Sequence, residues 1–395
     1  MARFLFVVPP LTGHINPTIA VAEELSKRGH DVAWVGYAAS LDPLVPAGAT
    51  VFGIDTEIGE AVFRHSYQQW PPLRAFAALK FLWEDFLIPI ATDMLAGVEA
   101  AIRDYQPDLL VCDQQALAGP VAARRNGIPW ATSATTFSEL TDPLASMPKV
   151  AQWVLDVMHG FQARSEVAPA IDLRWSDHLV LICSAPVLAG DRTYPDHYAF
   201  TGPIIRAISV ESEFPWEWLD SDRALVLASL GTLNVEAGIP FYRRLVEAAA
   251  GETERIQLVV VAPAGALHDL PENVLVREVV PQLELLRRAS AVVTHGGHNT
   301  VCEALTLGLP LVVAPIRDDQ PVIAERVVAA GAGVRVKFGR AGVGELRDAL
   351  LTVLRDGSYR TAAQRVADEF AQHSGARTAA ELLIELSETT NEVVR

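Results

Sequence analysis

The stretch Ser290-AVVTHGGHNTVCEALTLGLPLVVAPIRDD-Gln320 decides the fold. Ala291–Val293 is apolar and β-branched, which predicts a buried parallel strand. Gly296 and Gly297 follow it, and glycines after a strand let the backbone turn tightly and approach a ligand, because no Cβ intervenes. A helix predicted over His298–Leu307 then begins. Its unpaired N–H groups and positive dipole end indicate a site for an anion.

Polar side chains surround this predicted anion site. His295 can add a hydrogen-bond donor, and Asn299 and Thr300 occupy the first turn of the helix, so all three are suited to a diphosphate. Glu303 shares a helical face with Asn299, where its carboxylate can accept from sugar hydroxyls. Asp318-Asp319-Gln320 occupies the loop after the next strand. Ligands of open parallel sheets bind outside the carboxyl ends of the strands, where both clusters are expected.

The series from His295 to Glu303, with Gly308-Leu-Pro310 and Asp319-Gln320 downstream, resembles the nucleotide-sugar motif of the UDP-glycosyltransferase superfamily. The resemblance is closest to the bacterial macrolide and natural-product branch. It implies the α/β fold called GT-B, with two Rossmann-like doubly wound parallel-sheet domains facing across a cleft. In that family the residue at His295 contacts the diphosphate. The resemblance implies the other contacts as well: Asn299 and Thr300 to the phosphate next to the nucleoside, Glu303 to the ribose hydroxyls, and Asp319 and Gln320 to the donor hexose.

Two further segments resemble donor-binding parts of the family. Ser229-Leu-Gly231-Thr232 is similar to its Ser-x-Gly-Thr loop, which approaches the donor phosphates. Val280 stands before Pro281-Gln282 where many members have an aromatic residue that stacks on the base, and valine can pack on a ring but cannot stack. The family usually has asparagine at Ile323, so contacts there differ. The expected donor site comprises Gly13, Ser229, Gly231, Thr232, Val280, Gln282, His295, Gly297, Asn299, Thr300, Glu303, Asp319 and Gln320.

The N-terminal segment predicts a candidate general base. Phe4–Val8 reads as a buried strand, and Asn16-Pro17 predicts the start of a helix that runs to about Arg28. His14 therefore falls in the loop at the carboxyl end of the first strand, where a histidine can act as a base. The alternative is that His14 packs against its own loop. The resemblance implies that it deprotonates the acceptor hydroxyl.

A catalytic histidine needs a partner that orients it. Asp113 ends a predicted strand that starts at Asp108, so it is expected at a carboxyl end, whereas Asp108 belongs to the opposite edge. Asp113 can accept from one ring nitrogen of His14. Gln114 is a weaker candidate for contact with sugar or acceptor. The acceptor pocket is expected from residues 57–105, including His65 and Trp70, together with residues 135–137 and 147–161.

Composition narrows the classes of partner and cofactor. The chain has 395 residues, half of them hydrophobic, which is enough for two cores. Its net charge of −16 argues against nucleic acid and anionic membrane surfaces as partners. Cys112, Cys183 and Cys302 are widely spaced, so we expect no metal site and no cofactor besides the donor nucleotide sugar. The sequence shows neither a signal peptide nor a bilayer-spanning helix, which predicts a cytoplasmic monomer or homodimer.

The predicted organisation has four parts. They are an N-terminal acceptor-binding domain (1–203), an interdomain linker (204–222), a C-terminal nucleotide-sugar domain (223–380) and a tail helix (381–395) that can cross back to the first domain. The linker is placed at a segment of charge, proline and tryptophan with little sheet pattern.

The expected function is inverting transfer of a hexose, glucose, from a UDP-sugar or TDP-sugar to a hydroxyl of a small lipophilic natural product, as in antibiotic biosynthesis. His14 would be the base and Asp113 its partner. One alternative is a nucleotide-sugar epimerase of the same fold, which needs no acceptor pocket. The other is a non-catalytic nucleotide-sugar binding module, against which the pairing of His14 with Asp113 argues.

Overall fold

The computed structural model describes residues 1–57, 59, 61–62, 73, 75–190, 192–206, 213–231 and 235–394. Its contacts divide the chain into two compact units. Unit 1 comprises Met1–Ala185, Arg192–Arg206 and His373–Arg395, and unit 2 comprises Pro186–Asp191 and Ala207–Gln372. Each unit has its own parallel sheet, which confirms the predicted α/β fold class.

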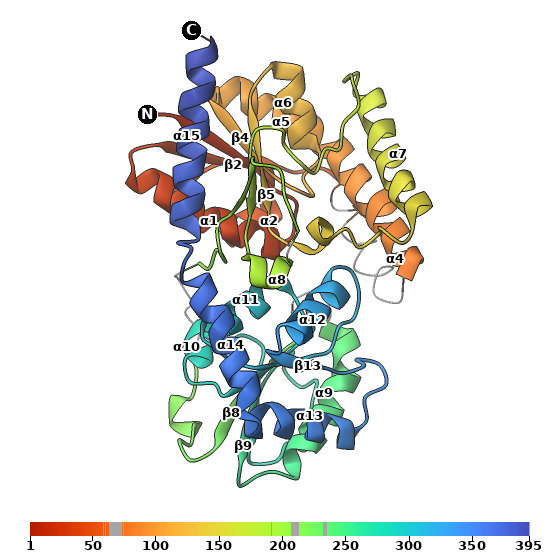
Figure 1. The fold of residues 1–395 in the computed structure, drawn as a ribbon, viewed down its shortest axis with the longest axis vertical. Helices are drawn as coiled ribbons and strands as arrows, with labels where there is room; N and C mark the ends of the chain where they lie inside the picture. Colours follow the sequence, from red (N-terminus) through yellow and green to blue (C-terminus); the bar gives the residue numbers. More distant parts are fainter. Residues whose placement is uncertain are drawn as a thin grey trace. The chain divides into compact units, whose positions relative to one another are not determined.

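Unit 1 is built on a seven-stranded sheet in the order β3-β2-β1-β4-β5-β6-β7 (Figure 1). Its strands are β1 Arg3–Val7, β2 Asp31–Tyr37, β3 Thr50–Ile54, β4 Leu109–Asp113, β5 Trp130–Ala134, β6 Val180–Ile182 and β7 Tyr198–Phe200. Its helices include α1 Thr12–Lys27, α2 Ala38–Leu41, α4 Ala75–Lys80, α5 Ile88–Tyr105, α6 Ala118–Asn126, α7 Pro148–Arg164 and α15 Ala376–Val394. Strands β3 and β7 were not predicted from the sequence.

Strand β1 shows why this sheet is buried on both faces. Leu5 and Val7 belong to the core cluster that α5 and α6 cover. Phe4 and Phe6 alternate with them and belong to the other cluster, which takes in residues of α1 and α15. Side chains of a strand point alternately to opposite faces, so a continuous apolar run is what a sheet covered on both sides requires.

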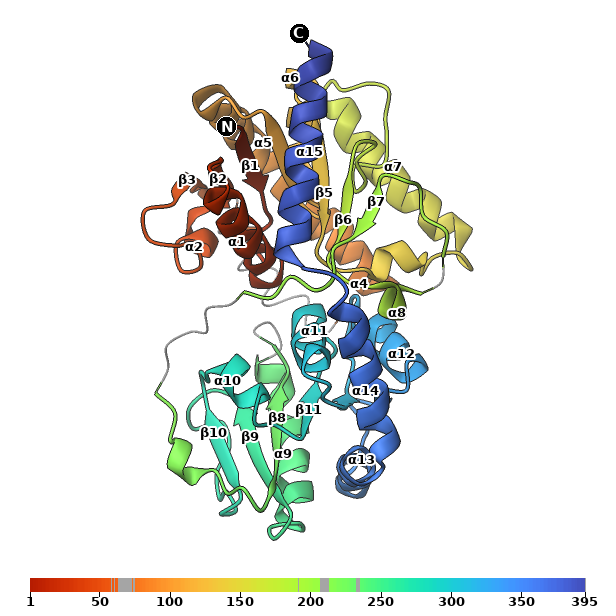
Figure 2. The same cartoon turned by 60° about the vertical axis from the view of Figure 1, so that its left-hand side comes forward.

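Unit 2 repeats this plan with a six-stranded sheet in the order β10-β9-β8-β11-β12-β13 (Figure 2). Its strands are β8 Ala224–Ser229, β9 Ile256–Val261, β10 Val274–Arg277, β11 Ala291–Thr294, β12 Leu311–Val313 and β13 Gly333–Arg335. Its helices are α8 Pro186–Ala189, α9 Val235–Ala250, α10 Gln282–Leu286, α11 His298–Thr306, α12 Gln320–Ala329, α13 Val343–Arg355 and α14 Gly357–Phe370. Thr294 pairs with Ser229 and with Val313, so the carboxyl ends of β8, β11 and β12 are level.

Two helices belong to a different unit from the segment that precedes them in the chain; the sequence analysis expected this for the tail helix but not for α8. Helix α15 begins at Ala376 and packs on α1 in unit 1, with Leu383 fully buried (Figure 2). Helix α8 lies within residues 1–203 of the chain but groups with unit 2. There the Leu188 carbonyl accepts from Arg326 Nε at 2.7 Å, and the Val187 N–H donates to Glu369 at 2.8 Å.

The predicted linker is attached to unit 2 over its described part, residues 213–222. Arg288 lies over the Trp216 ring at 4.3 Å from its centroid. Gln257 binds this segment at two points, donating to the Trp218 carbonyl at 2.9 Å and accepting from the Asp220 N–H at 2.7 Å. The tryptophans therefore anchor this segment to the domain, as an apolar ring with a nearby cation does.

The aromatic stretch 57–105, from which the acceptor pocket is expected, is helical over its second half. Helix α4, a π-helix over Phe81–Leu87 and α5 follow one another from Ala75 to Tyr105. Trp83 and Phe86 are buried in the core of unit 1, so these aromatic residues mark a helix packing face. His65 and Trp70, predicted for the acceptor pocket, lie outside the described residues. Among the helices that the structure describes, none combines the length and apolar character needed to cross a bilayer.

Candidate active site

The first group of predicted site residues lies at the carboxyl ends of β1 and β4 in unit 1. Helix α1 begins before Pro17, because the Leu11 carbonyl accepts from the N–H groups of His14 and Ile15 at 2.9 and 3.1 Å. His14 thus stands in the first turn of α1 and not in a loop, which corrects the sequence expectation. The parallel register of β1 and β4 brings this turn beside Asp113.

His14 and Asp113 form a hydrogen-bonded pair. Nδ1 of His14 lies 3.0 Å from Oδ1 and 3.0 Å from Oδ2 of Asp113. The Asp113 side chain is fully buried, and that of His14 is 16% exposed. A carboxylate only accepts, so this pairing favours the ring proton on Nδ1. Nε2 is then the nitrogen that can take up a proton.

Asp113 has two further hydrogen-bond donors. The Gln115 backbone N–H donates to Oδ1 at 2.8 Å, and the Thr135 hydroxyl donates to Oδ2 at 2.8 Å. Thr135 Oγ1 also lies 2.8 Å from His14 Nδ1. The sequence assigned Thr135 only to the acceptor pocket. Its position directly after β5, the neighbour of β4, is the signal that could have indicated this contact.

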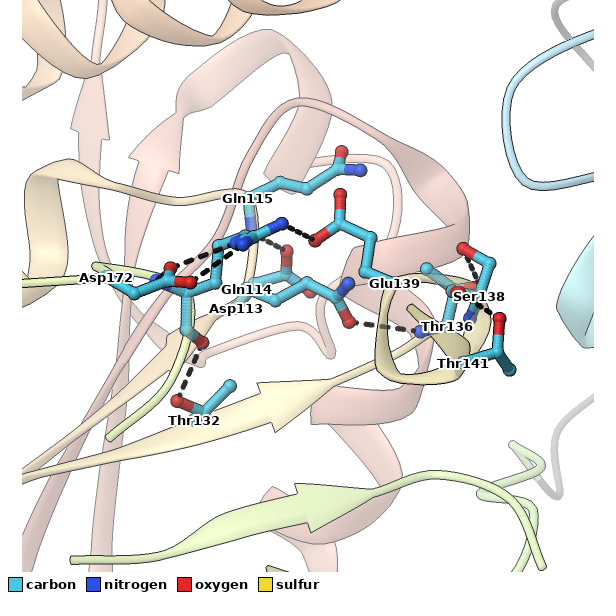
Figure 3. A network of polar contacts seen from close by, with 10 residues as sticks. Asp113, Gln114, Gln115, Thr132, Thr136, Ser138, Glu139, Thr141 and Asp172 are labelled. Atoms are coloured by element: carbon cyan, nitrogen blue, oxygen red, sulfur yellow. Dashed lines mark hydrogen bonds and ion pairs between the residues drawn. The ribbon is translucent and has the colours of Figure 1, made fainter. Parts of the chain in front are cut away.

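Figure 3 shows polar contacts that continue beyond Asp113, at the carboxyl ends of β4 and β5. Gln114 is buried, and its side-chain oxygen accepts from the Thr136 N–H at 3.3 Å. Its side-chain nitrogen is buried and has no hydrogen-bond partner among the described residues. Gln114, a weaker candidate from the sequence, thus offers a donor in the immediate neighbourhood of Asp113.

An arginine joins two carboxylates in the same network. Arg174 makes two hydrogen bonds to Asp172, at 2.9 and 2.7 Å, and one to Glu139 at 3.4 Å (Figure 3). Burial raises the pKa of Glu139, and the charge of Arg174 opposes that shift. The guanidinium also lies 5.8 Å from the Trp83 ring and 5.7 Å from the Trp175 ring. Ionic and aromatic contacts therefore hold this side of unit 1 together.

The second group of predicted site residues surrounds the start of α11 in unit 2. Strand β11 ends at Thr294, whose hydroxyl accepts from the Gly296 N–H at 3.2 Å. Gly296 has φ of 91°, which favours glycine. Helix α11 begins two residues later, with Asn299 and Thr300 partly buried in its first turn. The predicted order of strand, glycine turn and helix is therefore present.

The His295 ring lies in a slot with glycine on both sides. A Cβ on Gly231 would lie 2.8 Å from the ring Cε1, and a Cβ on Gly297 would lie 2.7 Å from both Cε1 and Nε2. Real Cβ atoms do not approach other atoms so closely, so any larger residue at either position would displace the ring. The turn after β8 and the turn after β11 therefore meet at His295.

His295 is a neutral side chain near pH 7. Burial lowers its pKa to about 4, the positive charge of Arg317 acts in the same direction, and a hydrogen bond to the Ser229 backbone opposes both. Nδ1 is buried and has no hydrogen-bond partner among the described residues. The sequence did not single out Arg317, a buried residue of the loop after β12. A buried polar atom without a partner is a candidate ligand contact.

Gln282 and Glu303, both predicted for the donor site, contact each other. Gln282 Nε2 at the start of α10 donates to Glu303 on α11. Burial raises the pKa of Glu303 to about 7, and the hydrogen bond from Gln282 opposes that shift. A substantial fraction of this carboxyl is therefore protonated at neutral pH, which the sequence did not indicate.

We expect Glu303→Gln to stabilise the free protein above pH 7. A carboxyl with a raised pKa contributes stability in its protonated form, and this contribution is lost as pH rises from about 4.5 to about 7. The loss is at most about 3 kcal/mol, and the glutamine variant does not undergo it. Urea unfolding of both proteins at pH 5 and pH 8 measures the difference.

The control for this prediction is Glu325→Gln, which removes one negative charge at an exposed position of α12. Its stability relative to the parent protein should be the same at both pH values. The stability of Glu303→Gln relative to the parent protein should be greater at pH 8 than at pH 5. If it is the same at both pH values, the assignment of a protonated Glu303 is wrong.

The turn after β12 contains the residues predicted for the donor hexose. Gln320 Oε1 accepts from the N–H groups of Ile316 and Arg317 at 2.9 and 3.1 Å, so the oxygen closes this turn. The end of Gln320 that can face a ligand is its NH2 group. Asp319 precedes α12 but does not cap it through its side chain. A Cβ on Gly296 would lie 3.2 Å from the Gln320 carbonyl oxygen, so the two turns are in contact.

Three other residues predicted for the donor site are Val280, Gly13 and Thr232, and the structure describes the first two. Val280 is buried next to Pro281, so it can offer an apolar contact but not the aromatic stacking that many family members have at this position. Gly13 stands beside His14 in the first turn of α1 and is exposed. Thr232 lies outside the described residues, so its predicted contact with the donor phosphates stays a prediction.

Known proteins are similar in sequence to this chain over nearly its whole length. Residues 245–386 match the family described as erythromycin biosynthesis protein CIII-like, C-terminal domain. The chain is 29% identical to 4'-demethylrebeccamycin synthase of Lentzea aerocolonigenes, covering 97% of this chain and 99% of that protein. It is 30% identical to demethyllactenocin mycarosyltransferase of Streptomyces fradiae, covering 97% of this chain and 86% of that protein. The chain belongs to the bacterial natural-product glycosyltransferases.

A solved structure extends this similarity to three dimensions. The glycosyltransferase matches the crystal structure of the glycotransferase of kitacinnamycin with a TM-score of 0.77 and 27% identity, over 98% of this chain and 99% of that one. The two parallel-sheet units are thus those of the GT-B fold. The glycosyltransferase is of the natural-product type that uses sugar-nucleotide donors, and the predicted enzyme class is confirmed.

Proposed function

We propose that this glycosyltransferase moves glucose from a UDP-sugar to a hydroxyl of a small lipophilic acceptor, with inversion at the anomeric carbon. His14 is the general base and Asp113 is the partner that orients it. The observation that carries the proposal is the contact of His14 Nδ1 with both oxygens of the buried Asp113, at 3.0 Å each. A base with an oriented ring and a stabilising anion is what activation of a hydroxyl requires.

The proton moves in one direction through this pair. As the acceptor oxygen attacks the anomeric carbon, its proton passes to Nε2 of His14, and the ring becomes an imidazolium. Asp113 then faces a positive charge through Nδ1, which lowers the energy of that state. The carboxylate keeps its orientation because the Gln115 N–H and the Thr135 hydroxyl also donate to it.

The diphosphate is the leaving group, and unit 2 supplies its binding site. Negative charge grows on the diphosphate as the bond between the anomeric carbon and the phosphate oxygen breaks, while the bond to the acceptor oxygen forms. The Gly296–Gly297 turn, the first N–H groups of α11, Asn299 and Thr300 provide donors and a positive dipole end for that charge. The neutral His295 ring in its glycine slot adds a buried polar contact. Preorganised donors of this kind need no rearrangement during the reaction.

The other residues proposed to bind the nucleotide sugar favour a ribonucleotide that carries a hexose with all its hydroxyl groups. Glu303, next to Gln282, can accept from ribose hydroxyls, which favours UDP over TDP. Asp319 and the NH2 group of Gln320 offer an acceptor and donors for hydroxyls of the hexose, which favours glucose over a deoxygenated sugar. Val280 provides the apolar contact for the base.

Product analysis tests this proposal. Purified enzyme is incubated with UDP-glucose, TDP-glucose and deoxygenated sugar analogues, each with a panel of lipophilic hydroxylated aglycones. We expect a β-glucoside from the α-linked UDP donor, read from the anomeric proton coupling. Retention of configuration, epimerisation of the donor without an acceptor, or donor binding without any turnover would each reject the proposed reaction.

A further inference from the structure

We infer that Thr135 is a third member of the proton-accepting unit, where its hydroxyl fixes the tautomer of His14 and the orientation of Asp113. This inference rests on the proposed role of His14 as the base. Thr135 is a positioning residue in this scheme, because it acts on the substrate only through the other two side chains. It explains why a threonine immediately after β5 belongs to the chemistry of the site.

The three side chains close a ring of hydrogen bonds. Thr135 Oγ1 lies 2.8 Å from Asp113 Oδ2 and 2.8 Å from His14 Nδ1, and that same nitrogen lies 3.0 Å from each oxygen of Asp113. Thr135 and Asp113 are each 2% exposed. In a buried site, each of these short contacts is favourable only when one atom donates a proton and the other accepts it, so together they determine which atoms carry the protons.

Counting protons around the ring leaves one arrangement. The carboxylate of Asp113 has no proton to give, so the single proton of the Thr135 hydroxyl goes to Asp113 Oδ2. A lone pair of Thr135 Oγ1 then faces His14 Nδ1. Two facing lone pairs repel, so Nδ1 carries the ring proton and shares it between the carboxylate and the hydroxyl. Nε2 is left without a proton and can act as the base.

The hydroxyl matters most when the base becomes charged. In the imidazolium, Nδ1–H keeps two kinds of acceptor, the anion of Asp113 and the oxygen of Thr135. Without the hydroxyl, Asp113 retains the Gln115 N–H and His14 as partners, but its Oδ2 loses a donor in a place where water has little access. Loss of a hydrogen bond to a charged group corresponds to a rate decrease of roughly 10- to 100-fold.

The test compares Thr135→Val, which keeps the shape but removes the hydroxyl, with Thr135→Ser, which keeps the hydroxyl. We expect Thr135→Val to lower kcat by roughly 10- to 100-fold with unchanged donor affinity, and Thr135→Ser to retain most of the activity. Thr135→Ala is the second variant without a hydroxyl and should behave like valine. Thr201→Val is the matched control, since Thr201 is fully buried and its hydroxyl, among the described residues, contacts the backbone oxygens of Ile182 and Gly202.

Nitrogen-15 NMR of the histidine rings provides a readout that a purely structural role would not change. The signals of His14 are assigned by their absence from the spectrum of a His14→Gln variant. In the unsubstituted enzyme they should show a proton on Nδ1 and none on Nε2. Thr135→Val should lower the fraction of His14 rings with the proton on Nδ1, because Asp113 alone then favours that tautomer, and Thr135→Ser should leave the fraction unchanged. A proton on Nε2 in the unsubstituted enzyme would overturn the inference even if both variants without the hydroxyl failed to fold.

The outcomes separate this inference from the proposed function. If His14→Gln is inactive while Thr135→Val keeps full kcat and a single tautomer, only the role of Thr135 is wrong. If His14→Gln retains full activity, the proposed base itself is wrong, and the inference fails with it. Loss of kcat in Thr135→Val, recovered in Thr135→Ser, together with the tautomer change, supports both.

Discussion

We expect His14→Ala to lower kcat by ~10²–10⁴-fold, the usual contribution of a positioned general base. The buried Asp113 holds Nδ1 at 3.0 Å, so the reacting nitrogen of this side chain is Nε2, and alanine removes it altogether. The diphosphate site that we propose lies in unit 2, so the affinity for UDP should not change. Steady-state kinetics with a saturating donor measure kcat, and titration calorimetry with UDP measures the affinity.

Two further substitutions sharpen this prediction. Asp113→Asn keeps the shape of the partner but replaces a carboxylate oxygen with an NH2 group, so it should also lower kcat strongly while preserving UDP affinity. His178→Ala, at an exposed position of unit 1, is the control and should retain activity. Activity of His14→Ala within a few-fold of the parent enzyme would show that another group deprotonates the acceptor.

His295→Ala should lower kcat/KM for the nucleotide sugar by ~10²–10³-fold. This is the range found when one hydrogen-bond donor is removed from a site that stabilises developing charge. Its ring fills the slot between Gly231 and Gly297 and places a buried nitrogen at the start of α11. Alanine empties that slot and removes the polar contact that we propose for the diphosphate. In contrast to His14→Ala, this variant should bind UDP more weakly, which calorimetry measures directly.

Gly297→Ala tests the same slot without removing the histidine. Its new Cβ would lie 2.7 Å from the ring of His295, so the ring must move, and UDP affinity should fall in the same direction by a smaller factor. His268→Ala, at an exposed position of unit 2, is the control. Equal losses of UDP affinity in His14→Ala and His295→Ala would contradict the division of roles between the two units.

Much of the donor half of the site could be predicted because its signals are local. The strand, the glycine turn and the first turn of α11 lie within a few residues of one another, so their spacing in the sequence determines their arrangement. The start of α1 was less predictable. Asn16-Pro17 is a common helix start, but backbone hydrogen bonds to Leu11 begin the helix earlier and place His14 inside it.

The helical character of the aromatic stretch, residues 75–105, was not visible in the sequence for a physical reason. Phe81, Trp83 and Phe86 lie in a π-helix, whose repeat differs from the 3.6-residue period that reveals an amphipathic α-helix. Their burial depends on packing against residues from distant parts of unit 1, including Phe161 and Leu173. A pattern based on local periodicity therefore could not show that this segment is helical.

The sequence by itself determined the two parallel-sheet domains, the glycine turn before α11 and the candidate pair of His14 and Asp113. The first two follow from apolar runs and glycine positions, which act over short distances along the chain. The pair, whose members are 99 residues apart, follows from the family resemblance and from the expected strand ends. Only the tertiary structure decided that Thr135 joins that pair and that Gly231 and Gly297 enclose His295. Thr135 and His14 are 121 residues apart, and the order of the strands in the sheet, with β5 next to β4, brings the threonine to both Asp113 and His14.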